Sequence, residues 1–134
     1  MILVDSSVLI DYLEGRENSP VSRFVEVLDR GIPFGISSVT ILEVLQGAAT
    51  EKDFSTLHDY LGSQTVYGLK GGLESYAGAA KIFFDLRRKG MSVRSSMDCM
   101  IAQTAIEHGL LLLHNDSDFN RIAQVSSLKI YGRI

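Results

Sequence analysis

Short runs of continuously apolar residues alternate with longer helical stretches along this chain of 134 residues. Strands are predicted at residues 1–4, 33–37, 65–69, 110–114 and 128–132. Helices are predicted at residues 7–15, 20–31, 39–49, 52–62, 72–90, 95–109 and 117–125. Short apolar strands separated by helices predict an α/β fold, with a short, mostly parallel sheet covered by helices on both faces.

The length and composition are those of a globular domain with a substantial core. Hydrophobic residues make up 46% of the chain and charged residues 22%, which is an ordinary balance. No run of 18 apolar residues is present, so we expect no contact with a membrane interior. An acid at position 5 argues against a signal peptide, and the single cysteine, Cys99, cannot form an internal disulfide. Both features favour a cytoplasmic location.

Acidic residues stand at the carboxyl ends of two predicted strands. Asp5 directly follows the apolar run of the first strand, and Asp116 and Asp118 follow the strand at 110–114. Ligands of parallel sheets bind outside these strand ends. A buried carboxylate is costly unless it is paired, so each acid either caps the helix that follows or contacts a cation.

Two further acids lie on predicted helices. Asp98 falls within the apolar stripe of its helix, where it faces the sheet, although a capping box with Ser95 is an alternative explanation. Glu43 points away from the apolar side of its own helix, so periodicity alone predicts that it is exposed to solvent. That apolar side is formed by Ile41, Leu42, Val44, Leu45 and Ala48.

Three segments together resemble the PIN-domain ribonucleases, and most closely the VapC toxins of VapBC toxin–antitoxin pairs. These are "LVDSSVLID", "SSVTILEVLQGA" and "VRSSMDCMIAQTAIEHGLLLLHNDSDFNRI". The resemblance covers nearly the whole chain and implies a PIN-like three-layer fold, with residues 1–134 forming a single nuclease domain. It places the acidic residues of the family on Asp5, Glu43, Asp98 and Asp116.

The resemblance also implies lesser roles for two more residues. Asp118 matches a further acid that assists at the site, and Ser7 matches a small polar residue that lines the pocket. One departure is visible, because many family members carry Thr or Ser just before the fourth acid, where this chain has His114 and Asn115. His114 lacks the spacing of a metal ligand, and Cys99 is interpreted as a packing residue.

Four carboxylates in one place need cations. A pair of like charges at 4 Å costs about 4 kcal/mol at an effective dielectric constant near 20. Mg²⁺ or Mn²⁺ prefers carboxylate oxygens and water, so we expect one or two such ions at the site. The expected reaction is hydrolysis of RNA by a metal-activated water, and the resemblance implies products with a 5′-phosphate and a 3′-hydroxyl.

The net charge of −3 at first argues against a nucleic-acid substrate. The chain has 16 acidic residues and 13 Lys plus Arg, so without the four candidate acids the remainder is slightly basic. Arg94 directly precedes Ser95 and is the better candidate for binding substrate phosphate. Arg87, Arg88 and Lys89 could do the same, or could interact only with the dipole of their helix.

The resemblance implies three partners: an RNA substrate, a small VapB-like antitoxin and a second copy of the chain. Two other classes of function compete with this interpretation. A phosphohydrolase of the haloacid dehalogenase type or a phospho-receiver domain also has an Asp after the first strand, but this chain has Ser7 where the former usually has a second Asp, and neither class has a clear lysine partner here. A PIN-like module that binds without cleaving is the other alternative.

Overall fold

The computed structural model describes residues 1–132, which form five strands and seven helices. The strands are β1 (Ile2–Val4), β2 (Phe34–Ser37), β3 (Val66–Tyr67), β4 (Leu111–Leu113) and β5 (Lys129–Ile130). The helices are α1 (Ser6–Leu13), α2 (Ser19–Asp29), α3 (Ser38–Leu45), α4 (Glu51–Gly62), α5 (Gly72–Arg88), α6 (Ser96–His108) and α7 (Asp118–Val125). Every element predicted from the sequence is present, and residues 133–134 of the expected domain lie outside the described residues.

The five strands form one sheet in the order β3-β2-β1-β4-β5, and every pair of neighbours is parallel. The predicted parallel sheet is therefore confirmed. Strand β1 lies at its centre, with Val4 opposite Leu113 in the register of β1 and β4. This register brings the ends of β1 and β4 together, and the backbone N–H of Asp5 donates to the carbonyl of Leu113 at 2.9 Å.

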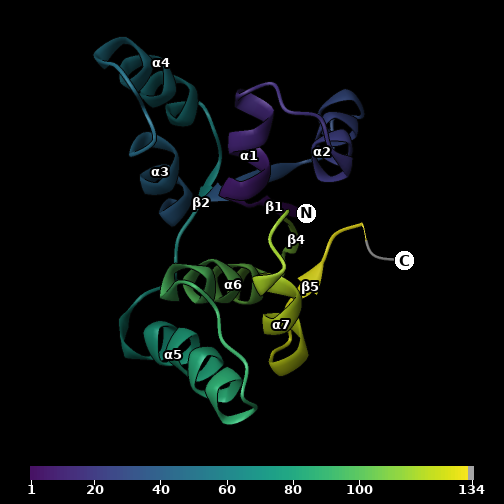
Figure 1. The fold of residues 1–134 in the computed structure, drawn as a ribbon, viewed down its shortest axis with the longest axis vertical. Helices are drawn as coiled ribbons and strands as arrows, with labels where there is room; N and C mark the ends of the chain where they lie inside the picture. The colour runs from purple at the N-terminus through teal and green to yellow at the C-terminus, as the bar shows by residue number, and fades with distance from the viewer. Residues whose placement is uncertain (133–134) are drawn as a thin grey trace.

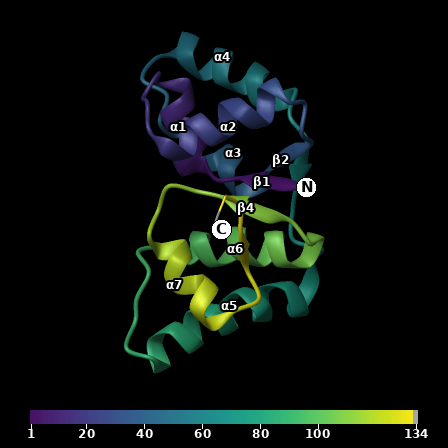
Figure 2. The same cartoon turned by 90° about the vertical axis from the view of Figure 1, so that its right-hand side faces the viewer.

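Helices cover both faces of the sheet, as predicted (Figure 1). Helices α1 to α4 lie on one side and α5 to α7 on the other, and Figure 2 shows the sheet between these two layers. Side chains of β1 alternate between two hydrophobic cores because successive residues of a strand point to opposite faces. Ile2 and Val4 pack with Phe24 in the core under α1 and α2, whereas Leu3 packs with Ile101 in the core under α6.

The observed strands are shorter than the predicted ones, most clearly at β3. Beyond Tyr67 the backbone bonds to α6 instead of a neighbouring strand. The Nε2 atom of His108 lies 2.8 Å from the carbonyl of Gly68, and the N–H of Lys70 donates to Glu107 at 2.8 Å. Side chains on a distant helix thus end this strand, and local composition does not reveal such contacts. Within residues 1–132, no helix has the length and apolar character that crossing a membrane requires.

Candidate active site

Asp5 caps a helix with one carboxylate oxygen, and its other oxygen has no partner in the part of the chain that the structure describes. Its Oδ2 accepts hydrogen bonds from the backbone N–H of Ser7 at 2.9 Å and from the Ser7 hydroxyl at 2.5 Å, which caps α1. Its Oδ1 is buried and accepts no hydrogen bond from residues 1–132, and only 3% of the residue is exposed. Burial raises the pKa of Asp5 to about 6, and repulsion from Glu43 contributes to the rise. The cap therefore satisfies only half of this carboxylate.

Glu43 is half-buried and turned toward the start of α1. The hydroxyl of Ser6 donates to Oε1 of Glu43 at 2.6 Å. The exposure predicted from periodicity is therefore wrong, and Leu42, assigned to the buried stripe, is 51% exposed. The physical reason is that α3 packs against α1, α4 and α6, so more than one of its sides is covered.

Asp98 lies in the first turn of α6, beside the ends of β1 and β4. The Ser95 hydroxyl caps this helix through the N–H of Met97, but Asp98 does not complete a capping box, because within residues 1–132 its carboxylate accepts no hydrogen bond. Burial raises the pKa of Asp98 to about 7. Repulsion adds to this rise, and it comes from the carboxylates of Asp5, Asp116, Asp118 and Glu43.

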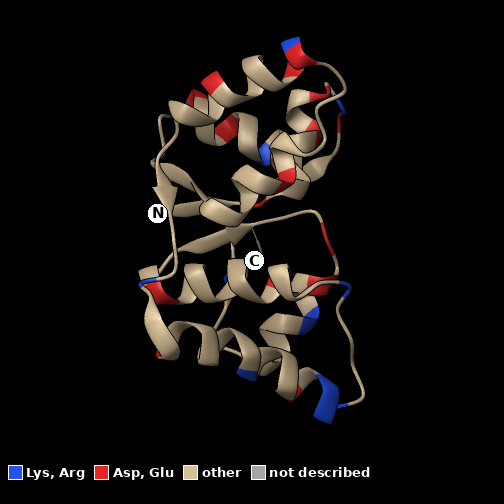
Figure 3. Ribbon diagram, turned by 90° about the vertical axis from the view of Figure 1, so that its left-hand side faces the viewer, with Lys and Arg blue, Asp and Glu red and all other residues tan. Residues whose placement is uncertain are grey.

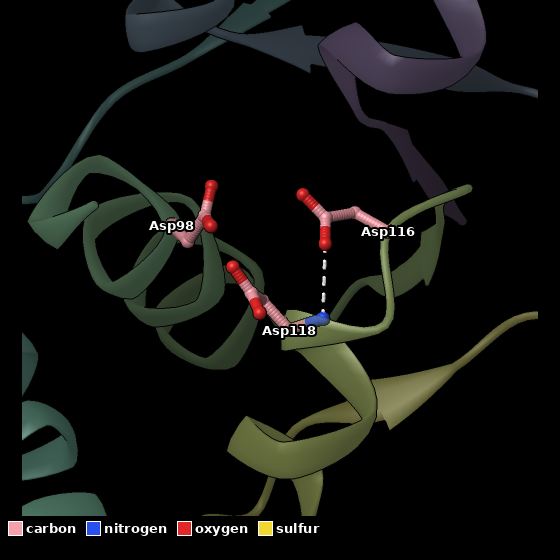
Figure 4. Close-up of side chains that lie close together, drawn as sticks. All are labelled: Asp98, Asp116 and Asp118. Carbon is pink, nitrogen blue, oxygen red and sulfur yellow. Dashed lines mark hydrogen bonds between the residues drawn. The ribbon is translucent and has the colours of Figure 1, made fainter. Parts of the chain in front are cut away.

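Asp116 and Asp118 complete the acidic cluster from the loop after β4. Each of Asp98, Asp116 and Asp118 offers one carboxylate oxygen, and these three oxygens lie within 4.8 Å of one another (Figure 4). The N–H of Asp118 donates to Oδ1 of Asp116 at 3.0 Å, which fixes the turn that leads into α7. The structure thus brings carboxylates from β1, α3, α6 and the β4–α7 loop into electrostatic contact.

Arg94 reaches this cluster from the loop before α6. Its Nη2 lies 3.2 Å from Oδ2 of Asp116 and its Nε lies 3.6 Å from Oδ2 of Asp118. The other basic residues considered from the sequence lie elsewhere. Arg87 and Arg88 are in the last turn of α5, over the rings of Phe83 and Phe84 on the same helix.

Ser7 and Asn115 join the segment after β1 to the β4–α7 loop, and His114 bonds within that loop. The Ser7 hydroxyl donates to Asp5 and accepts from the N–H of Asn115 at 2.9 Å. Nδ1 of His114 accepts from the N–H of Asp116 at 3.1 Å. Local hydrogen bonding before the fourth acid is therefore present, with the imidazole of His114 as the acceptor.

Two residues of this site, Ser6 and Arg121, were not singled out from the sequence, and Asn115 was noted only as a departure from the family pattern. Arg121 donates to Oδ1 of Asp118 at 2.7 Å, and this pair could have been found from its spacing of three residues on a helix. The contacts of Ser6 and Asn115 join residues 37 and 108 positions apart, so no local signal announces them. Cys99 is buried, and burial raises its thiol pKa to about 11, in keeping with a packing residue.

The arrangement has the donor set that a hard divalent cation requires. Oxygens of Asp98, Asp116 and Asp118 lie within 4.8 Å of one another. Asp5 is not part of this trio, but its charge acts on Asp98, and no described residue donates a hydrogen bond to its buried Oδ1. The repulsion among these acids persists unless positive charge enters. Histidine and cysteine, which favour zinc and softer metals, do not belong to this cluster of described residues. The chemistry of the donors therefore suits Mg²⁺ or Mn²⁺.

The model of the PIN domain family matches residues 2–125, so the chain belongs to this family. It is similar to two curated proteins, ribonuclease VapC11 of Mycobacterium tuberculosis and VapC ribonuclease Mb1587 of Mycobacterium bovis. In each case 28% of 130 aligned residues are identical, which covers 96% of both chains.

Solved structures share the fold. VapBC2 from Rickettsia felis, bound to a DNA fragment from its promoter, aligns with a TM-score of 0.74 at 20% identity over 97% of both chains. DNA-bound VapBC from Salmonella typhimurium aligns with a TM-score of 0.72 at 22% identity, over 96% of this chain and 95% of that one. At these identities the likeness concerns the fold, and it agrees with the α/β architecture described above.

Proposed function

We propose that this protein is a metal-dependent endoribonuclease, and that it acts as the toxin of a type II toxin–antitoxin pair. One observation carries the proposal: acids from four separate segments converge at the carboxyl edge of the sheet, and a buried oxygen of Asp5 there has no partner among the described residues. The names of the curated relatives support the same reaction. We propose further that the whole chain forms a single nuclease domain.

Asp5, Asp98 and Asp116 are the residues that would hold Mg²⁺ or Mn²⁺, as one or two ions, with Glu43 as a further ligand or acting through water. When bound, a divalent ion supplies positive charge for the phosphate oxygens and a water that loses its proton more readily. We do not propose Asp118 as a metal ligand, because its two oxygens already accept from Arg121 and from the N–H of Arg94.

The remaining residues of the site orient these acids. Ser6 holds Glu43, and Ser7 holds Asp5 while also binding the backbone of Asn115. Because the hydroxyl of Ser7 is engaged on both sides, we assign it to positioning Asp5 and not to binding substrate. Neutral hydroxyls fix a carboxylate without cancelling its charge, so the site stays anionic and attracts cations.

The proposed partners follow from the relatives. Solved neighbours are VapBC assemblies, so we propose that a small antitoxin binds this chain. An antitoxin that placed a basic side chain near the acids would compete with the metal ion for them. A homodimer and a cytoplasmic location also remain predictions of the sequence.

The proposal is tested by incubating the protein with a mixed-sequence RNA pool in Mg²⁺ or Mn²⁺. We expect cleavage that stops on chelation and that falls about a hundredfold or more in Asp5→Asn, the size of the loss of one preorganised electrostatic group. Asp59→Asn is the matched control, because this carboxylate is 84% exposed on α4 and should leave the rate unchanged. Retention of RNA without cleavage would instead support the binding module, and equal cleavage by Asp5→Asn would overturn the proposed site.

A further inference from the structure

Asp118 differs from the other acids of the site because both of its oxygens contact basic residues. Oδ1 accepts from Nη1 of Arg121 at 2.7 Å, and Oδ2 accepts from the backbone N–H of Arg94 at 3.1 Å and lies 3.6 Å from its Nε. The Asp118 side chain is only 6% exposed, so these contacts are shielded from water on the carboxylate side. One buried carboxylate thus lies between two arginines: it accepts from the guanidinium of Arg121 and the backbone of Arg94, whose guanidinium also bonds Asp116.

These two arginines line a polar cavity next to the acidic cluster. The cavity has a volume of about 440 Å³, and its wall is formed by Ser92, Val93, Arg94, Ser117, Asp118 and Arg121. The side chains of Arg94 and Arg121 are 81% and 41% exposed. Each guanidinium has five N–H donors. Arg94 uses donors for Asp116 and faces Asp118, and Arg121 uses one for Asp118, so both side chains keep donors for a ligand in the cavity.

The charge distribution of the whole chain favours an anion on this side. Residues 1–69 contain ten Asp and Glu but four Lys and Arg, whereas residues 70–132 contain six acids and eight Lys and Arg. Figure 3 shows basic segments in the loop after α5 and on α7 beside the acidic segments of the site, and a further basic segment at the end of α5, away from the site. A polyanion that approaches the acids would be attracted along this side and repelled along α1 to α4.

We propose that Arg94 and Arg121, held by Asp118, form a clamp for a backbone phosphate of the RNA that flanks the scissile linkage. This inference rests on the proposed function, since it assumes that the bound anion is the substrate strand. It assigns Asp118 to positioning: the carboxylate sets the spacing of two forked donors, and such donors match the oxygens of a phosphodiester. It also assigns a substrate contact to Arg121, which lies outside the acidic cluster.

The test measures RNA binding without cleavage. Asp98→Asn serves as the background, and affinity for a fluorescent mixed-sequence single-stranded RNA pool is followed by anisotropy over a range of KCl concentrations. In this background, Arg121→Gln should weaken binding roughly tenfold at low salt, since one charge-assisted contact is lost. It should also reduce the slope of log affinity against log salt by about 0.7, the value for one phosphate contact on a single strand.

Two variants separate a phosphate contact from a structural ion pair. Arg121→Lys keeps the charge and should restore the salt slope, although it breaks the forked geometry. Arg30→Gln is the matched control, because Arg30 forms an exposed ion pair with Glu26 on α2 and should change neither affinity nor slope. Arg121→Gln with an unchanged salt slope would overturn the clamp.

Chemical substitution of the RNA locates the contact. Once a cleaved site is mapped, short oligonucleotides with a neutral methylphosphonate at each neighbouring linkage are compared for binding to Asp98→Asn and to the double variant Asp98→Asn, Arg121→Gln. The clamp predicts one linkage whose replacement weakens binding to Asp98→Asn but not to the double variant. The absence of any such linkage would contradict the clamp. Failure of the Asp98→Asn protein to bind RNA at all would instead count against the proposed function, so the two outcomes are distinguishable.

Discussion

The two halves of the acidic site are held in different ways. In the amino-terminal half, serine hydroxyls orient the acids: Ser7 bonds Asp5 and Ser6 bonds Glu43. In the carboxy-terminal half, Arg94 contacts Asp116, and Arg121 contacts Asp118. Hydroxyls fix geometry and leave the negative charge in place, whereas arginines fix geometry and cancel it. The comparison assigns anion binding to the arginines around Asp118, whose two oxygens both contact basic residues. It assigns cation binding to the acids that arginines do not contact on both oxygens, and Asp116, with one arginine contact, is among them.

The largest effect is expected where charge is least compensated, at Asp98. Replacement by Asn keeps the shape of the side chain and removes a carboxylate that accepts no hydrogen bond within the described residues. RNA cleavage in Mg²⁺ should fall at least about a hundredfold. In the metal-free protein the same change should raise the midpoint of thermal unfolding, because it removes repulsion among the acids. A catalytic loss accompanied by lower thermal stability would contradict the assignment of Asp98 to an uncompensated cluster.

Divalent ions should stabilise the protein through the same acids. At a free Mn²⁺ concentration one hundred times the dissociation constant, the free energy of unfolding should rise by about 2.7 kcal/mol, provided that the unfolded chain does not bind the ion. The measurement is thermal unfolding with and without Mn²⁺. Asp98→Asn should lose most of the increase and Asp59→Asn none of it. An equal increase in all three proteins would place the ion elsewhere.

The metal-free protein should lose stability as the pH rises from about 4 to about 7. The pKa of Asp5 is about 6 and that of Asp98 about 7 in the folded protein, against 3.8 as the ordinary value, and burial is the main cause of both shifts. Between these values the folded state binds more protons than the unfolded state, so the free energy of unfolding falls with increasing pH. Chemical denaturation in chelator across this range measures the trend, and Asp98→Asn should flatten it. A rise in stability over the same range would contradict these shifts.

A smaller effect is expected at Ser6, which acts through Glu43. Ser6→Ala removes the only side-chain donor to this carboxylate among the described residues, so Glu43 should become less well positioned. We expect the cleavage rate to fall about tenfold, which corresponds to about 1.4 kcal/mol, and less than for Glu43→Gln. Ser63→Ala, which removes a hydroxyl bonded to the carbonyl of Tyr60, is the control. If Ser6→Ala and Ser63→Ala have equal rates, the hydroxyl does not orient Glu43.

Much of the fold could be predicted because it depends on local patterns. Apolar runs between helices predicted the parallel sheet, and the position of Asp5 after β1 and of Asp116 after β4 placed both at one edge. Only half of the capping box considered for Asp98 is present: Ser95 caps the helix, but the Asp98 carboxylate makes no capping bond among the described residues and is repelled by the other acids. The strand ends at Asp5 and Asp116 and the apolar stripe that contains Asp98 were thus enough to predict where the site lies.

Glu43 shows where local patterns end. Its orientation depends on how α3 packs between distant helices, so the helical wheel placed it in solvent and only the resemblance to PIN-domain nucleases placed it with the other acids. The same limit applies to Ser6 and Asn115, whose partners are far away in the sequence. The pair of Arg121 and Asp118 could have been predicted, because residues three apart on a helix are neighbours. The second contact of Asp118, with Arg94, spans 24 residues and is set by the tertiary fold.

Anomalous X-ray diffraction from crystals grown with Mn²⁺ tests the central claim most directly. The account predicts an anomalous peak bounded by carboxylate oxygens of Asp5, Asp98 and Asp116, with Glu43 ligating directly or through a water molecule. The account would be contradicted if the protein cleaved RNA in the same Mn²⁺ buffer while its crystals showed the ion bound elsewhere and none at these four side chains.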